Sequence, residues 1–289
     1  MLKISYHNHT NYSDGIDTPE AMAAEAYCAG YTHFAITDHI YSADYPDWTV
    51  NPEGYRSYVK HIARIKQEYA GKMQLFIGIE ADWYKNQGTA FTEYEVLEPM
   101  IDFTVGSIHI LNPGGKRYLI DGSIDFYTAC LEEAYGGNIE KMITDYYETY
   151  LQMANGLKPN LLGHIDIMRK NNPNNRFFDE RDAWVIRLQE TAAKEIKKLN
   201  LVTEINGGGA YRYQNNVVYP SEQFLHILKD EGVKLTIGLD AHSVEMVDSY
   251  YQDSLNLAKK IGFRELHYFE NGNWIAAPIE HFSSVSRNA

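Results

Sequence analysis

Short apolar runs alternate with helix-length segments along the whole chain, and this alternation restricts the possible folds more than any other feature. Seven or eight strand and helix units in 289 residues are typical of a parallel α/β barrel. No linker or repeat divides the sequence, so we predict a single domain over residues 1–289. The expected strands are Leu2–Tyr6, His33–Thr37, Leu75–Ile79, Phe103–Ser107, Asn160–Gly163, Leu201–Ile205 and Lys234–Leu239, with a possible eighth at Glu265–Phe269.

Capping residues mark several of the expected helices. Thr18 is placed to cap the amino end of a helix that Gly30 ends, while Asn51 and Ser221 each precede a further helix. Residues 110–137 are rich in glycine and less regular, and we predict a loop elaboration over one face of the barrel. We expect the run Gly207–Gly209 to form a flexible turn.

Composition excludes some classes of partner. The chain carries 26 basic and 39 acidic side chains, a net charge of −13, which disfavours binding to nucleic acid through phosphate contacts. Cys28 and Cys130 are far apart in sequence, so we expect neither a disulfide framework nor a thiolate metal site. With no signal peptide or membrane-spanning run recognisable, we predict a cytoplasmic protein that does not bind membranes, while its oligomeric state stays open.

Polar residues follow nearly every expected strand at its carboxyl end, which is where barrel enzymes place their functional groups. Six of the eleven histidines take such positions, an arrangement that random scatter does not explain. The candidate metal ligands are His7, His9, Asp14, His39, Glu80, His109, His164, Asp240 and His242.

The spacing of these residues favours a metal centre with more than one ion. Side chains two apart on an extended segment face the same side, so His7 and His9 can hold one ion, as can Asp240 and His242. Imidazole and carboxylate donors suit zinc, manganese or iron, and so many ligands predict two or three divalent transition-metal ions, with Glu80 as a bridge. Such a centre supports hydrolysis of phosphate esters, and Asp240 or His242 are the candidate catalytic groups for proton transfer.

Motifs along most of the chain resemble the polymerase and histidinol phosphatase superfamily, called PHP. The quoted segments are His7-x-His9, Ser13–Gly15, Thr37–His39, Gly78–Glu80, Gly106–His109, Gly163–Asp166 and Asp240–His242. The continuations Glu80–Asp82, Glu204–Asn206, Val218–Pro220 and Tyr268-Phe269-x-x-Gly272 are most similar to its monofunctional histidinol-phosphatases.

The resemblance implies a distorted (β/α)7 barrel with a trinuclear site. By it, His7, His9, Glu80 and Asp240 hold one metal; Glu80, His109 and His164 hold the second; and Asp14, His39 and His242 hold the third. Ser5 and Leu239 depart from the family pattern without removing a matched ligand. The implied activity is hydrolysis of L-histidinol phosphate, a small-molecule phosphate monoester, in histidine biosynthesis.

Other side chains are candidates for supporting roles. Asp38 and Asp166 each neighbour a predicted ligand, and we expect them to orient an imidazole. A phosphate monoester also needs cations beyond the metals. Arg169 and Arg212 are the predicted substrate-binding residues, and Lys170, Lys116 and Arg117 are weaker candidates.

Three alternatives to histidinol phosphate hydrolysis stay open. The first is a related phosphoesterase acting on another small ester, on phosphotyrosine or on a diester. The second is an amidohydrolase-type barrel, although no expected strand ends in the lysine that bridges metals in many such sites. The third is a non-catalytic metal-binding or regulatory module, which the complete ligand set disfavours.

Overall fold

A computed structural model describes residues 1–90, 97–213 and 217–283. Within these residues, seven parallel strands form one curved sheet in the order β1, β2, β3, β5, β8, β9, β10. Their bounds are Ile4–Ser5, His33–Ile36, Gln74–Tyr84, Phe103–Ser107, Leu161–Leu162, Val202–Asn206 and Lys234–Gly238.

The two outer strands of this sheet approach each other beyond their carboxyl ends. Asn8, after β1, forms a parallel bridge with Ala241, after β10. The backbone N–H of Asp240 donates to the His7 carbonyl at 2.8 Å, and that of His9 donates to the Ala241 carbonyl at 2.8 Å. The sheet therefore closes at this end, and the predicted seven-stranded barrel is confirmed.

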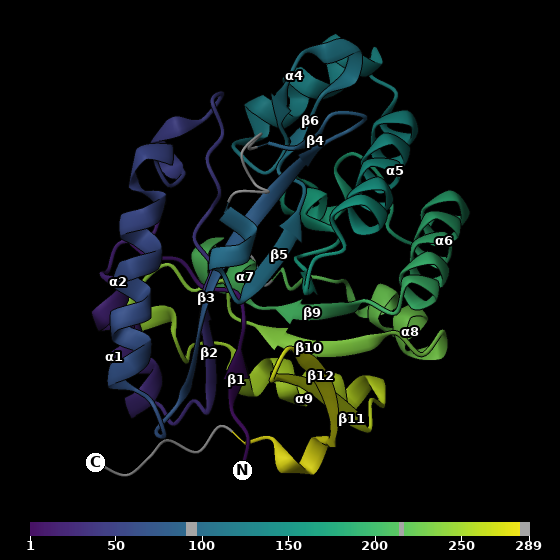
Figure 1. The fold of residues 1–289 in the computed structure, drawn as a ribbon. Coiled ribbons are helices and arrows are strands. Elements are labelled where there is room, and N and C mark those ends of the chain that lie inside the picture. Colours follow the sequence, from purple (N-terminus) through teal and green to yellow (C-terminus); the bar gives the residue numbers. More distant parts are fainter. Residues whose placement is uncertain (91–96, 214–216, 284–289) are drawn as a thin grey trace.

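Helices lie outside the strands (Figure 1). Thr18 caps α1 by accepting a hydrogen bond from Ala21, and Ser221 caps α8 by accepting one from Phe224. Asn51 caps a short 3-10 turn that leads into α2. In the described part of the chain, no helix combines the length and apolar character needed to cross a membrane. The helices are α1 (Pro19–Cys28), α2 (Tyr55–Glu68), α4 (Ile124–Tyr135), α5 (Ile139–Leu157), α6 (Ala183–Leu199), α7 (Gly208–Tyr213), α8 (Glu222–Asp230) and α9 (Tyr251–Ile261).

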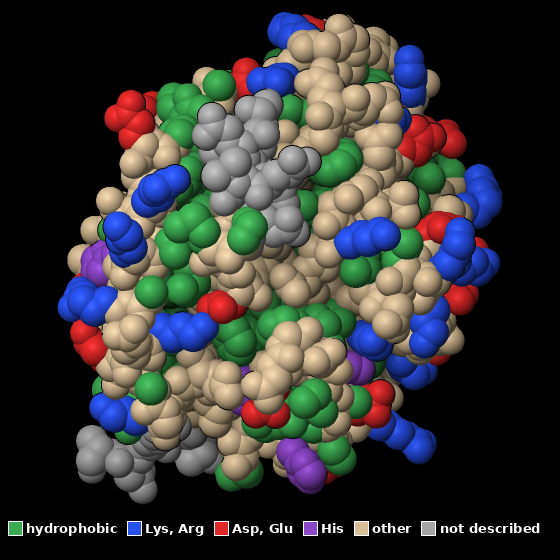
Figure 2. All heavy atoms as spheres, viewed as in Figure 1, with side chains coloured by type: hydrophobic (Ala, Val, Ile, Leu, Met, Phe, Trp, Pro, Cys, Tyr) green, Lys and Arg blue, Asp and Glu red, His purple; other side chains and the backbone are tan. Residues whose placement is uncertain are grey.

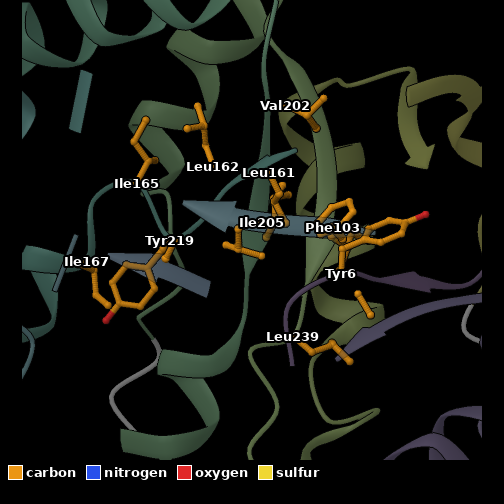
Figure 3. Close-up of a cluster of buried hydrophobic side chains, with 14 of the residues drawn as sticks. Tyr6, Phe103, Leu161, Leu162, Ile165, Ile167, Val202, Ile205, Tyr219 and Leu239 are labelled. Carbon is orange, nitrogen blue, oxygen red and sulfur yellow. The ribbon is translucent and has the colours of Figure 1, made fainter. Parts of the chain in front are cut away.

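The possible eighth strand exists but does not join the barrel. It is β11 (Glu265–Glu270), which pairs antiparallel with β12 (Asn273–Pro278) in a separate hairpin. The N–H of Phe269 donates to the Tyr6 hydroxyl at 2.7 Å, and the Tyr6 ring stacks on Phe103 with 5.3 Å between centroids. Tyr6 and Phe103 belong to the buried hydrophobic cluster of Figure 3, so the hairpin packs against the core.

The segment 110–137 is more regular than we predicted. It contains the hairpin β6 (Ile110–Leu111) and β7 (Tyr118–Leu119), followed by α4. Gly114 and Gly115 have positive φ angles in the hairpin turn, and Gly136 ends α4 in the left-handed conformation. The glycines that suggested an irregular loop therefore mark the ends of short regular elements.

Candidate metal centre

The structure brings all nine predicted ligands together at the carboxyl ends of the barrel strands. Eight are buried, and the Asp14 side chain is 23% exposed. Their donor atoms, together with those of Asp82, fall into overlapping groups in which all atoms lie within 4.8 Å of one another. The groups are His9, Asp14, His39 and His242; His7, His9 and Asp240; His7, Glu80 and His164; and His39, Asp82 and His109.

Glu80 lies at the centre of these groups and presents one oxygen to each side. Its Oε1 is 3.0 Å from His164 Nε2 and 3.6 Å from His109 Nε2. Its Oε2 is 3.1 Å from His7 Nε2 and 3.0 Å from His39 Nδ1. The carboxylate therefore has the arrangement of a bridge between two cations, with Oε1 and Oε2 serving different sets of imidazoles.

Asp240 and Asp14 each lie beside further histidines. Asp240 Oδ1 is 3.2 Å from His9 Nε2. Asp14 Oδ2 is 3.1 Å from His242 Nε2, and Asp14 Oδ1 is 3.7 Å from His39 Nε2. Positions for cations thus exist beside Glu80 and, separately, beside Asp14.

Two buried carboxylates fix the orientation of predicted ligands, and the sequence analysis did not assign them this role. Glu204 Oε1 lies 2.9 Å from His7 Nδ1, and Asp82 Oδ2 lies 3.0 Å from His109 Nδ1. Each carboxylate accepts a hydrogen bond from Nδ1, so Nε2 is the ring nitrogen that faces Glu80 and would bind a metal. The alternation of side chains along a strand could have identified Asp82, because it lies two residues after Glu80 on β3 and therefore faces the same side.

The two carboxylates that we expected to orient imidazoles do something else. Asp38 accepts hydrogen bonds from the Thr10 N–H at 2.7 Å and from the Ser13 hydroxyl at 2.6 Å, and so it holds the loop that carries Asp14. Asp166 accepts from the Ser221 N–H at 2.8 Å. The prediction was wrong for both because adjacency along the chain does not determine which backbone a buried carboxylate reaches.

The ionisation and hydrogen bonding of the donor side chains are suited to the binding of cations. Burial raises the pKa of Glu80, but His7, His39 and His109 hold it well below its usual value. Several buried donor atoms, His7 Nε2, both His9 nitrogens and Glu80 Oε2 among them, have no hydrogen-bond partner in the described structure. Buried polar atoms rarely lack partners, so this donor set is suited to metal ions. Nitrogen and oxygen donors without thiolates match zinc, manganese or iron.

Gly208 and Gly209 begin α7 and Gly207 directly precedes it, which corrects the predicted flexible turn. A Cβ atom on Gly208 would lie 2.8 Å from the Asp240 Cβ, and one on Gly207 would lie 2.6 Å from the Tyr250 Cβ. The Gly208 N–H also donates to Asn206 Oδ1 at 2.9 Å. Gly208 therefore allows a close approach of the backbone to Asp240, and Gly207 allows one to Tyr250.

A cavity of about 250 Å³ opens onto the donor cluster. Lys170 lines it, while the guanidinium of Arg169 is turned away and contacts Glu180 at 2.8 Å and the Val218 carbonyl at 2.8 Å. Arg212 lies in α7, but its side chain is outside the described part of the structure. The other two candidate cations are paired elsewhere, Lys116 with Glu133 and Arg117 with Asp44.

The fold and this donor set define a class, the α/β barrels with a metal centre at the carboxyl ends of their strands. The chain matches the PHP domain over residues 5–207, and it belongs to that family.

Relatives and solved structures agree over most of the chain. A Schizosaccharomyces pombe protein named "Probable histidinol-phosphatase" is 25% identical, with 94% of this chain and 90% of that protein covered. The Bacillus subtilis protein named "Histidinol-phosphatase" is 23% identical, with 87% and 98% covered. The crystal structure of histidinol phosphate phosphatase from Lactococcus lactis, complexed with zinc, L-histidinol and phosphate, superimposes with a TM-score of 0.63 at 19% identity, covering 94% of this chain and 98% of that one.

Proposed function

We propose that this chain is a metal-dependent histidinol-phosphatase, which hydrolyses L-histidinol phosphate to L-histidinol and phosphate in histidine biosynthesis. The observation that carries the proposal is the convergence of nine side chains with nitrogen or oxygen donors, Glu80 among them, beside the cavity. The names of the curated relatives support the same substrate, as does the binding of zinc, L-histidinol and phosphate by the Lactococcus protein.

The donor groups support two or three divalent ions of zinc, manganese or iron. His7, His9 and Asp240 would hold one ion with Glu80, and His109 and His164 would hold a second with Glu80. Asp14, His39 and His242 would hold the third. When bound, such ions supply an activated water and positive charge for the phosphate oxygens.

Asp240 and His242 are the proposed groups for proton transfer. Asp240 lines the cavity, and its backbone φ of 52° turns the side chain into the space beside Gly208. His242 Nδ1 lies 2.8 Å from the Asp240 carbonyl, which fixes the imidazole ring. One of the two would take or give the proton that the leaving alkoxide requires.

The cavity favours a small phosphate monoester over a polymer. Its volume of about 250 Å³ accommodates one small ester. Lys170 is the best-placed described cation for the phosphate, whereas Arg169 supports the wall from behind by binding Glu180. Lysine and arginine side chains are scattered among acidic and apolar ones across the face shown in Figure 2, which does not favour nucleic acid.

A phosphate-release assay on the metal-loaded protein tests the proposed class. The panel holds histidinol phosphate, other small monoesters, phosphotyrosine and a diester under one metal regime. We expect turnover of monoesters led by histidinol phosphate. A preference for the diester or for phosphotyrosine would replace the proposal with one of the related phosphoesterase activities.

A further inference from the structure

Asp121 stands out on the wall of the active-site cavity. Apart from the proposed metal ligands, it and Lys170 are the charged residues among the described residues that line the cavity. Asp121 follows β7 and precedes α4, so it is supplied by the segment 110–137 and not by a barrel strand. The segment that covers the barrel therefore contributes a charge to the site beneath it.

The surroundings of Asp121 place its charge beside the metal centre. The Lys170 ammonium donates a hydrogen bond to the Asp121 backbone carbonyl, so the two residues are neighbours on the wall. Asp121 lines the same cavity as the proposed ligands Glu80 and His109, so it lies beside the metal centre.

The Asp121 carboxylate has no hydrogen bond or ion pair within residues 1–90, 97–213 and 217–283. It is only partly exposed. Partial burial of a carboxylate costs free energy, and a cationic partner in the same cavity offsets this cost. The Lys170 ammonium bonds to the backbone carbonyl of Asp121 and not to its carboxylate.

We propose that Asp121 binds the ammonium group of the substrate and thereby selects phosphate esters of amino alcohols. This inference rests on the proposed function. In histidinol phosphate the ammonium and the phosphate ester are attached to adjacent carbons, so a residue that binds the ammonium must lie next to the phosphate site. Lys170 beside Asp121 offers the matching pair of charges, positive for the phosphate and negative for the amine.

Trp48 completes the subsite with an aromatic wall. Its ring lies edge-on to His39, with 4.7 Å between centroids, and to His109, with 5.9 Å between centroids. It also lines the cavity. A flat apolar surface of this kind suits the imidazole end of the substrate, while Asp121 binds the ammonium group between the imidazole and the phosphate ester.

The test compares Asp121→Asn with the unaltered protein, both metal-loaded. The substrates are histidinol phosphate and its desamino analogue, imidazolylpropyl phosphate, which keeps the ester and the ring but lacks the ammonium. We expect the ratio of their kcat/KM values to fall by about 10- to 100-fold in Asp121→Asn, mainly through KM for histidinol phosphate. Calorimetric binding of L-histidinol should weaken in parallel, a readout that does not depend on turnover.

Asp125→Asn is the matched control, because it removes the same charge from an exposed position in the first turn of α4. It should keep the substrate ratio of the unaltered protein. An unchanged ratio in Asp121→Asn, or equal losses on both esters, would overturn the inference and leave the proposed function standing.

If the unaltered protein hydrolyses other monoesters but not histidinol phosphate, the proposed function fails. The inference is then decided with phosphoethanolamine against ethyl phosphate. A preference for phosphoethanolamine that Asp121→Asn abolishes supports it, and the absence of such a preference overturns it.

Discussion

The Nε2 atoms of His109 and His164 lie 3.2 Å apart in the floor of the cavity. The Nδ1 of His109 is held by Asp82, so its Nε2 faces His164 and Glu80 Oε1. His164 Nε2 also lies 3.0 Å from Glu80 Oε1, so two imidazole nitrogens and a carboxylate oxygen converge on one point, as the ligands of a single cation do. This contact is therefore the clearest sign of a metal position in the structure.

We predict two or three transition-metal ions per chain, because the donors form more groups than one ion can use. Elemental analysis of protein purified without chelator measures this number. His109→Ala should lower it, since one set of donors around Glu80 loses a member. A content well under one ion per chain in active protein would contradict the prediction.

Glu80→Gln should abolish activity to a greater extent than Asp166→Asn. The Glu80 oxygens contact two sets of imidazoles, whereas Asp166 accepts a hydrogen bond from Ser221 and contacts no predicted ligand side chain among the described residues. Loss of a supporting carboxylate typically costs about 10–100-fold, and loss of a bridging ligand should exceed that. Steady-state assays at saturating metal give the order. If Asp166→Asn were much the worse, the roles assigned to the two residues would be wrong.

Lys170→Met should raise KM for a phosphate monoester by about 10- to 100-fold, as expected for the loss of a charge-assisted hydrogen bond. Lys116→Met is the control, because Lys116 pairs with Glu133 outside the cavity. Arg169→Lys should have a smaller effect on KM than Lys170→Met, since Arg169 contacts Glu180 and Val218 and does not line the cavity. A larger increase of KM in Arg169→Lys than in Lys170→Met would indicate that Arg169, and not Lys170, contacts the phosphate.

We predict that His33 makes the free energy of unfolding depend on pH in the acid range. Burial lowers its pKa to about 4, so between pH 6.5 and 4 the unfolded chain binds a proton that the folded chain does not. The free energy of unfolding should therefore decrease as the pH falls through this window, by at most about 3 kcal/mol from this group. His33→Gln should remove that part of the slope in urea titrations of metal-free protein. His226→Gln, which removes an exposed histidine on α8, should leave the slope unchanged.

Much of the barrel and the position of the centre could be predicted from the sequence, because both depend on periodic features. The strand beginning at Phe103 matches its predicted bounds, since a short β-rich run between turn residues leaves little choice of register. His7, His39 and Asp240 meet because parallel barrel strands end on one face.

What the sequence could not supply is mostly contact between distant segments. The role of Glu204 depends on a hydrogen bond to His7 across 197 positions of sequence. The position of Arg169 depends on Glu180, which draws the guanidinium away from the cavity. Gly208 follows β9 and packs against Asp240, which follows β10. Such a contact between distant segments leaves no local sequence pattern, so the sequence predicted a flexible turn there.

The most direct test of the account is the ratio of kcat/KM for histidinol phosphate to that for p-nitrophenyl phosphate, measured with the metal-loaded protein. A donor cluster beneath a small cavity that carries both Lys170 and Asp121 should bind the zwitterionic ester far better than the aryl ester, which lacks an ammonium. We predict a strong preference for histidinol phosphate that is lost when a chelator removes the metals and regained when they are restored. Equal turnover of the two esters, or turnover that chelation leaves intact, would contradict the account.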